Sequence, residues 1–479
     1  ANNQFDFADV VEQARLLNEQ PYREETVTLP ADLNDMDYDT FRTLRYVREK
    51  GPWFGKNIPF EIQFFHPGSL FKQQVQINEI FDKKATEIAY DPEAFTLKDQ
   101  ALPSWPDVGY AGFRLHYPLN RSDYYDELIT FLGASYFRAL GRGQKYGLSA
   151  RGIAVDTGLE TGEEFPRFVR FWIPRPVQRQ RQIMVYALLD SPGLTGAYQF
   201  LIRPGKTTTM EITTVLFPRR NIQKLGVAPL TSMYLFGENT KHRFFDYRPE
   251  VHDSDGLLVH NGADEWIWRP LDNARTLRIS SFEDTSLKGF GLLQRDRNPD
   301  HYQDFEADYH LRPGAWVEPL EGFGAGVVEL VEIPSDKEIH DNVVAFFVPK
   351  TPVASGQAYR FKYRLSWLSD EESIGNVKAR VLATYTGIGG VSGDPKEERV
   401  KFVIDFEKPT ADIQKIVPVV EASAGRLKEV VMIPNPLTDG VRVFFDFKPE
   451  KGKAIELSAR LEQDGKTVSE KWSYQWTGN

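Results

Sequence analysis

The sequence predicts a mainly β protein built from antiparallel sandwiches. Many short runs alternate apolar and polar residues, which is the pattern of strands with one buried face. The chain holds 36 Gly and 30 Pro, enough to interrupt these runs with frequent turns. The regular exchange of strands with long helices that marks a parallel sheet is missing. At 479 residues the chain is long for one domain, so two or three are expected.

Two stretches predict helices. Near the N-terminus, apolar residues recur at helical spacing behind Asp6, a suitable cap; they are Phe7, Val10, Ala14 and Leu17. A second helix is expected to begin at Ser122 and to end at Gly133. Its apolar face would consist of Tyr125, Leu128, Ile129 and Leu132.

The clearest strands lie near the C-terminus. One has Phe402, Ile404 and Phe406 on its apolar face, and another has Ile455, Leu457, Ala459 and Leu461. A polar, acidic stretch at 369–376 precedes this region and predicts a domain boundary. We therefore expect an N-terminal catalytic β-sandwich over 1–368, a linker over 369–380, and a C-terminal immunoglobulin-like sandwich over 381–479.

Composition excludes several classes of protein. A net charge of −10 argues against a nucleic-acid partner, because phosphate contacts need a basic surface. The chain has no cysteine, which excludes disulfides, thiolate metal sites and a cysteine nucleophile. It begins at Ala-Asn-Asn, as expected for an exported chain whose signal peptide has been removed, although a trimmed chain would look the same.

Local motifs for cofactors and metals are weak. The glycines at 141–147 lack the strand, helix and third-glycine spacing of a dinucleotide loop, so a tight turn is expected. Ser149 lacks the second glycine of a nucleophile elbow and is expected to be structural. His252, Asp253 and Asp255 lie close in sequence without the spacing of a metal site. We therefore expect no cofactor and no metal.

Carboxylates and aromatic residues remain as candidates. Cleavage of a glycosidic bond needs one acid and one base, which meet only in the folded chain. Asp253 precedes a glycine turn, and Asp341 lies where a polar turn enters an apolar strand. Taken alone, a single Asp of this kind is far more often a turn or cap residue than a catalytic one. Trp266 and Trp268 share one face of a strand and either stack on sugar rings or lie in the core.

The chain resembles the periplasmic glucan biosynthesis proteins G and D over its whole length. The resemblance rests on strings that occur in order, among them LGASYFRALGRGQKYGLSARG, YALLDSPGLTGAY, PEVHDSDGL, EWIWRPLDN, GFGLLQRDR, RPGAWVEP and VEIPSDKEIHDNVVAF. It implies a large N-terminal β-sandwich similar to galactose mutarotase, followed by the immunoglobulin-like sandwich. Asp255 and the segment 383–393 favour the D type.

The same resemblance implies an activity and its residues. The family is associated with endo-acting, inverting β-1,2-glucanases that act on osmoregulated periplasmic glucan during its biosynthesis. Asp341 would be the general acid and Asp253 the general base. Tyr309, Arg312 and Glu338 would contact substrate, together with Trp266 and Trp268 if these line the cleft. A loop around Gly387–Gly393 would reach over it.

Partners and location follow from the resemblance as well. We expect β-1,2-glucan as the ligand, the periplasm as the location, and a membrane glucan synthase as a candidate partner. A homodimer is left open. Two alternatives to hydrolysis also stay open: transglycosylation in the same cleft, and a non-catalytic glucan-binding scaffold for the synthase.

Overall fold

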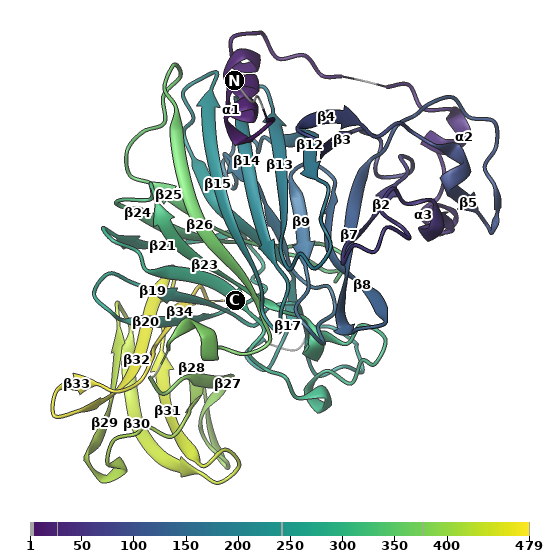
Figure 1. Ribbon diagram of the computed structural model, residues 1–479. Helices are drawn as coiled ribbons and strands as arrows, with labels where there is room; N and C mark the ends of the chain where they lie inside the picture. The colour runs from purple at the N-terminus through teal and green to yellow at the C-terminus, as the bar shows by residue number, and fades with distance from the viewer. Residues whose placement is uncertain (1–3, 26, 241–242, 377, 479) are drawn as a thin grey trace. The chain divides into compact units, whose positions relative to one another are not determined.

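The chain is mainly β, as the sequence predicts (Figure 1). The structure is a computed structural model that describes residues 4–25, 27–240, 243–376 and 378–478. The chain forms two compact units. The first comprises Ala1–Pro229, Val317–Gly326 and Phe346–Leu368, and the second comprises Leu230–Trp316, Val327–Ala345 and Ser369–Asn479. The domain boundary expected at 369–380 stays a prediction.

The first unit is a sandwich of two sheets. One sheet runs in the order β26 (Tyr359–Leu368), β15 (Thr208–Pro218), β14 (Leu194–Arg203), β13 (Ile183–Asp190), β12 (Arg167–Pro174), β3 (Gln76–Phe81) and β4 (Lys84–Glu87). The other contains β2 (Glu61–Phe65), β7 (Gly112–Arg121), β8 (Tyr124–Leu132), β9 (Tyr136–Ala139) and β10 (Ser149–Arg151). Buried phenylalanines join them: the rings of Phe113 and Phe171 lie 4.9 Å apart, and those of Phe131 and Phe200 lie 5.2 Å apart.

Short elements complete this unit. They are α2 (Ala31–Asn34), α3 (Tyr38–Phe41), a small sheet of β1 (Leu44–Tyr46), β5 (Phe95–Leu97) and β6 (Gln100–Ala101), and β11 (Ile153–Val155), which pairs with β16 (Leu225–Ser232). The chain passes from one unit to the other within β16, β23 (Gly314–Glu321), β24 (Gly326–Glu332) and β25 (Val343–Pro349), and again after β26.

The N-terminal helix is confirmed as α1 (Phe7–Asn18). Asp6 caps it by accepting a hydrogen bond from the backbone of Ala8, and Asp9 bonds back to the backbone N–H of Asp6. Val10 and Ala14 are fully buried, and Thr195 of β14 donates to the carbonyl of Ala14 at 2.7 Å. The apolar stripe read from the sequence is therefore the face that packs on the sheet.

The helix predicted from Ser122 to Gly133 is wrong, because this segment forms strand β8 in a hairpin with β7. The pairing register explains the error. Leu115 pairs with Ile129 and His116 pairs with Glu127, so Leu128 is the extra residue of a β-bulge. The bulge buries Leu128 and Ile129 side by side. An interrupted two-residue period then imitates the spacing of a helix.

The second unit also contains facing sheets. One run of strands is β29 (Ile416–Ala422), β32 (Ile455–Gln463), β34 (Lys471–Trp476), β20 (Trp266–Pro270), β19 (Gly256–His260) and β22 (Gly289–Leu293), with β33 (Lys466–Thr467) at the side of β32. A four-stranded sheet has the order β27 (Val381–Val391), β28 (Asp394–Phe406), β31 (Gly440–Lys448) and β30 (Arg426–Asn435). The remaining strands are β17 (Tyr234–Phe236), β18 (Val251–His252), β21 (Arg278–Asp284) and β24 (Gly326–Glu332).

Aromatic rings fill the space between the C-terminal strands. Phe402 of β28 lies 5.7 Å from Trp472 and 5.3 Å from Tyr474, both of β34. The apolar faces predicted at 402–406 and 455–461 are buried, which confirms both strands. Within the described part of the chain, no helix is long and apolar enough to cross a membrane.

Candidate functional site

The motif that holds Asp253 is fixed by backbone pairing. Strand β18 pairs with β17, and the N–H of Asp253 donates to the carbonyl of Met233 at 2.8 Å. The hydroxyls of Ser232 and Ser254 lie 2.7 Å apart. Asp253 is 5% exposed. Its place therefore depends on backbone contacts that a change of side chain leaves intact.

His252 anchors the same motif from beneath. The amide nitrogen of Gln294 donates to the carbonyls of His252 and Tyr309, so its oxygen faces Nδ1 of His252 at 2.8 Å. An amide oxygen only accepts, and Nδ1 therefore carries a proton. On the other side Nε2 lies 3.1 Å from Glu250. Burial, with a further contribution from Asp296, raises the pKa of Glu250 to about 8.

Asp255 closes the turn after Asp253. Its carboxylate accepts hydrogen bonds from the backbone N–H groups of Arg295 and Asp296, each at 2.9 Å. Burial raises the pKa of Asp255 to about 6, in spite of these bonds and of His252. The residue thus holds the motif against the irregular segment that follows β22.

Arg312 is the partner of Asp253. Its Nη1 donates to Oδ1 of Asp253 at 2.6 Å, while Nε and Nη2 donate to the carbonyl of Ala307 at 3.1 and 3.0 Å. The guanidinium carbon lies 4.3 Å from the centre of the Tyr309 ring. Among the described residues only Arg312 bonds to the side chain of Asp253, so Oδ2 remains available for a water or a sugar hydroxyl.

Tyr309 extends the chain of contacts to Glu338. Its hydroxyl donates to Oε2 of Glu338. Burial and the Glu338 carboxylate raise the pKa of Tyr309, so the phenol keeps its proton. Glu338 also accepts hydrogen bonds from Arg248 at 2.8 and 3.2 Å.

Sequence reasoning missed Arg248. Besides Glu338, it donates to Asp304 at 2.9 Å and to Asp246 at 2.8 Å, and this triple pairing raises its pKa. Two of these partners lie 56 and 90 residues away along the chain. The only signal in the sequence was its place four residues before the candidate motif of His252 and Asp253.

Asp341 follows Glu338 after one turn and is exposed. Its neighbour Asn342 is buried and brackets the backbone of Tyr234: the amide oxygen accepts from the N–H of Tyr234 and the amide nitrogen donates to its carbonyl, both at 2.9 Å. Asp253 is bonded to the preceding residue, Met233. Adjacent backbone positions therefore bond to Asp253 and to the residue that follows Asp341.

Asp253, Arg312, Tyr309 and Glu338 form one continuous cluster, and Asp341 lies three residues beyond its last member. The roles assigned to these five residues stay predictions. In the described part of the chain, the rings of Trp266 and Trp268 pack on residues outside this cluster. Both are 4% exposed; Trp266 stacks on His260 and Trp316, and Trp268 lies under Arg295. Their role in substrate binding stays a prediction.

The segment expected to be a loop at 387–393 is mostly strand. Strands β27 and β28 form a hairpin that turns at Ser392 and Gly393. The base of β27 is tied to the neighbourhood of β17: Thr384 N–H donates to Glu238 at 3.2 Å, and Thr386 donates to the carbonyl of Asn239 at 2.9 Å. The pairing shifts register between Ile388 and Gly389, so an irregular hairpin takes the place of the expected loop.

Three further side chains bring possible metal ligands together in the described residues: Glu250, Asp296 and His301, whose ligand atoms lie within 4.8 Å of one another. These atoms are already engaged in hydrogen bonds. Nδ1 of His301 lies 2.6 Å from Asp296, and Glu250 contacts His252. The group links the segment 296–301 to Glu250, which contacts His252.

Two weak motifs are structural, as the sequence suggested. The glycines at 141–147 form a tight turn in which Gln144 N–H donates to the carbonyl of Gly141 and Gly143 has a φ of 76°. Ser149 is buried and accepts a hydrogen bond from Arg138 at 2.8 Å.

Comparison with known proteins identifies the family. The family described as "Periplasmic glucan biosynthesis protein, MdoG" matches residues 5–476. The chain is 45% identical to "Glucans biosynthesis protein G" of Rhodopseudomonas palustris (strain BisA53), with 99% of this chain and 93% of the relative covered. It is also 45% identical to "Glucans biosynthesis protein D 1" of Ralstonia nicotianae, with 100% of this chain and 92% of the relative covered.

The family match covers residues 5–476. It therefore includes both the sandwich fold and the cluster of Asp253, Arg312, Tyr309 and Glu338. The chain belongs to the periplasmic glucan biosynthesis protein family. Relatives named G and D are equally similar, and the preference for the D type stays a prediction.

Proposed function

We propose that the chain is an endo-acting, inverting β-1,2-glucanase that acts on the backbone of periplasmic glucan during its biosynthesis. The observation that carries the proposal is the partly open cluster around Asp253, in which one carboxylate oxygen is held by Arg312 and the other has no protein partner among the described residues. An inverting reaction needs such a carboxylate to activate water on one side of the sugar.

Asp341 supplies the second group. As general acid it would protonate the leaving glycosidic oxygen, while Asp253 removes a proton from the attacking water. Its exposed position suits a group that touches a long polymer, and the rigid bracket of Asn342 on Tyr234 limits its movement. Inverting glycosidases separate the two carboxyl groups by about 6.5–9.5 Å, which leaves room for the water.

The neighbouring side chains would position the sugar. The Tyr309 hydroxyl donates a hydrogen bond to Glu338, and Arg248 donates to the same carboxylate. These hydrogen-bonded side chains can donate to and accept from sugar hydroxyls without rearranging. The names of the relatives support a role in glucan biosynthesis, and we propose the periplasm as the location.

The experiment is to incubate the purified chain with linear β-1,2-glucan and to follow chain length, new reducing ends and the anomeric form of the product. Wild type should shorten the polymer and release the inverted anomer. Asp341→Asn and Asp253→Asn should each lower the rate by about 10²–10⁴-fold. Asp439→Asn, on an exposed turn before β31, is the matched control and should keep full activity.

The alternatives give different products. Transglycosylation would yield branched or cyclised chains without new reducing ends. A scaffold would bind glucan and leave its length unchanged. Hydrolysis that survives in either Asp variant would remove that residue from the mechanism.

A further inference from the structure

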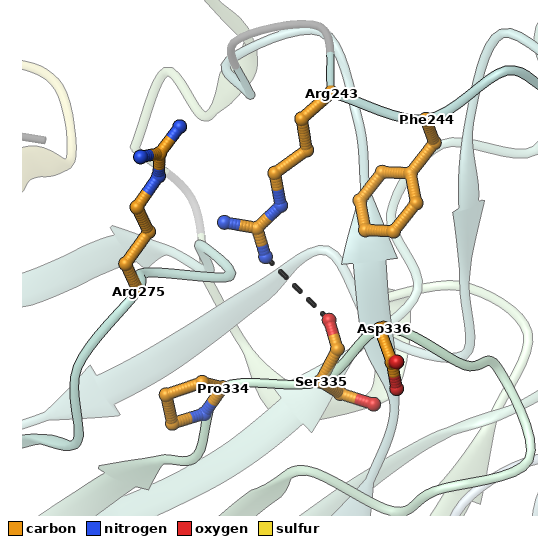
Figure 2. Close-up of a pocket in the computed structure, with 6 residues that line it drawn as sticks. All are labelled: Arg243, Phe244, Arg275, Pro334, Ser335 and Asp336. Atoms are coloured by element: carbon orange, nitrogen blue, oxygen red, sulfur yellow. Dashed lines mark hydrogen bonds between the residues drawn. The ribbon is translucent and has the colours of Figure 1, made fainter.

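A pocket of about 450 Å³ lies beside the segment that carries the candidate acid (Figure 2). It is lined by Arg243, Phe244, Arg275, Pro334, Ser335 and Asp336. Its volume falls in the range of about 300–1,000 Å³ that is usual for small-molecule sites. No member of this lining belongs to the cluster around Asp253.

The pocket adjoins that cluster on two sides. Asp336 stands two residues before Glu338, a separation of at most about 7 Å along an extended chain. On the other side, Phe244 packs against the buried apolar group that contains Tyr309, and its ring lies 5.4 Å from that of Phe236. A ligand in the pocket is therefore within reach of a polymer bound at Asp253 and Asp341.

The walls are held in place by buried contacts. Asn273, which is 3% exposed, donates to the carbonyls of Leu235 and Ser335 at 3.0 and 2.8 Å and accepts from the N–H of Ser335 at 3.1 Å. Arg243 donates to the same Ser335 carbonyl at 3.5 Å, the contact drawn in Figure 2. The pocket is thus preformed, which lowers the entropic cost of binding.

The chemistry of the lining suits an uncharged sugar ring. One face of Phe244 rests on Phe236, so its exposed part offers a fixed aromatic surface. Arg243 and Arg275 provide forked donors for neighbouring hydroxyls, and the Asp336 carboxylate provides acceptors. Arg275 is exposed and makes no recorded hydrogen bond or ion pair among the described residues, so its donors are available.

We propose that this pocket is a subsite for a non-reacting glucosyl unit of the same polymer, and that it sets the preference for long chains. The inference rests on the proposed function for the identity of the polymer. Binding energy from a remote unit positions the bond that reacts, so substrates too short to reach the pocket lose that contribution.

The test uses Arg275→Ala and Phe244→Leu, with Phe244→Tyr as the conservative variant. Binding of long linear β-1,2-glucan is measured by calorimetry in the Asp253→Asn background, and cleavage is measured in the wild-type background as a function of chain length. Arg275→Ala and Phe244→Leu should weaken binding of long chains by roughly tenfold, the effect of losing one good contact. Phe244→Tyr should bind long chains as tightly as wild type does. In all three variants the shortest cleaved chains should react as fast as in wild type.

The matched control is Arg426→Ala on β30, an exposed arginine outside the pocket, which should change neither quantity. Equal losses at every chain length, or none at any, would overturn the subsite. So would a loss confined to glucans with anionic substituents, because the pocket would then bind the substituent. If wild type leaves glucan uncut and Arg275→Ala still weakens binding, the hydrolase proposal fails and the subsite stands.

Discussion

Among the arginine–carboxylate clusters of the second unit, two have similar groups and different exposure. The closed cluster consists of Arg295, Glu371, Glu470 and Arg380, in which Arg295 bonds both glutamates at 2.7–3.0 Å. The open cluster consists of Asp253, Arg312, Tyr309, Glu338 and Arg248. Side chains of the closed cluster's central ion pairs are 0–8% exposed, whereas Arg312 and Glu338 of the open cluster are 21% and 37% exposed.

The difference lies in how completely each charge is satisfied. Trp268 covers Arg295 at 3.8 Å, and Glu470 accepts further bonds from Val381 N–H and Asn376. Partners among the described residues therefore engage every N–H of the Arg295 guanidinium and both oxygens of Glu470. In the open cluster Oδ2 of Asp253 keeps its capacity to accept. The fully paired charges of the closed cluster therefore hold the fold together. The incompletely paired carboxylate of the open cluster, near solvent, is available for catalysis.

The largest expected effect comes from breaking the closed cluster. Arg295→Met leaves Glu470 buried without its cation, and Glu371 with Arg380 alone. Removal of one partner from a buried ion pair costs about 3–5 kcal/mol, so the unfolding midpoint should fall markedly in thermal and urea titrations. The variant Arg295→Met, Glu371→Gln, Glu470→Gln should recover part of the loss, because no buried charge then lacks its partner. No recovery would assign the loss to packing under Trp268.

Breaking the open cluster should separate activity from stability. Arg312→Met removes the group that orients Asp253, and we expect the rate on β-1,2-glucan to fall by about 100-fold. The loss of stability should be smaller than for Arg295→Met, because solvent reaches the place that Arg312 occupies. Rates and unfolding midpoints measured on the same preparations decide this. A stability loss equal to that of Arg295→Met would mean that both clusters are structural.

The two clusters also show what sequence reasoning reaches. Helix α1 was predictable because its cap and its apolar stripe are local, and β28 and β32 because their alternation is unbroken. β8 was not, because a bulge created by its pairing with β7 changes the apparent period. The candidate residues came from the family's strings. Arg248 was missed because its contact with Glu338 joins positions 90 residues apart, which no local pattern records.

Glu250 differs from the acids of both clusters. It is buried, and no arginine or lysine among the described residues contacts it. Burial and Asp296 raise its pKa from the ordinary value of 4.5 to about 8. Between these values the folded chain keeps a proton that the unfolded chain has released, so the free energy of unfolding decreases as pH rises through this window. Below pH 4.5 Glu250 is protonated in both the folded and the unfolded chain, so its titration no longer changes the free energy of unfolding.

Glu250→Gln, which imitates the protonated acid, should therefore gain on wild type as pH increases from about 4.5 to about 8, by at least about 1.4 kcal/mol, the value of one pKa unit. Thermal unfolding of both proteins across this range measures the difference, and groups common to both cancel. The neighbours that face Glu250, namely Glu238, His252, Asp255, Asp296 and His301, are kept in both. A difference that does not vary with pH would show that Glu250 is ionised in the folded chain.

The smallest expected effect concerns the contact that joins the two halves of the open cluster. Tyr309→Phe removes the hydroxyl that donates to Glu338 and keeps the ring over which Arg312 lies. Glu338 retains its bonds from Arg248, so the carboxylate stays near its place. We expect the rate to fall by about tenfold and the unfolding free energy to change by no more than about 1 kcal/mol, the usual value of one hydrogen bond.

Tyr110→Phe, which removes a hydroxyl bonded to the carbonyl of Ala89 in the first unit, is the matched control and should cost similar stability without affecting the rate. If both variants keep the wild-type rate, the Tyr309 hydroxyl belongs with the fully paired, structural contacts of the closed cluster, and the reactive part of the open cluster narrows to Asp253 and Arg312.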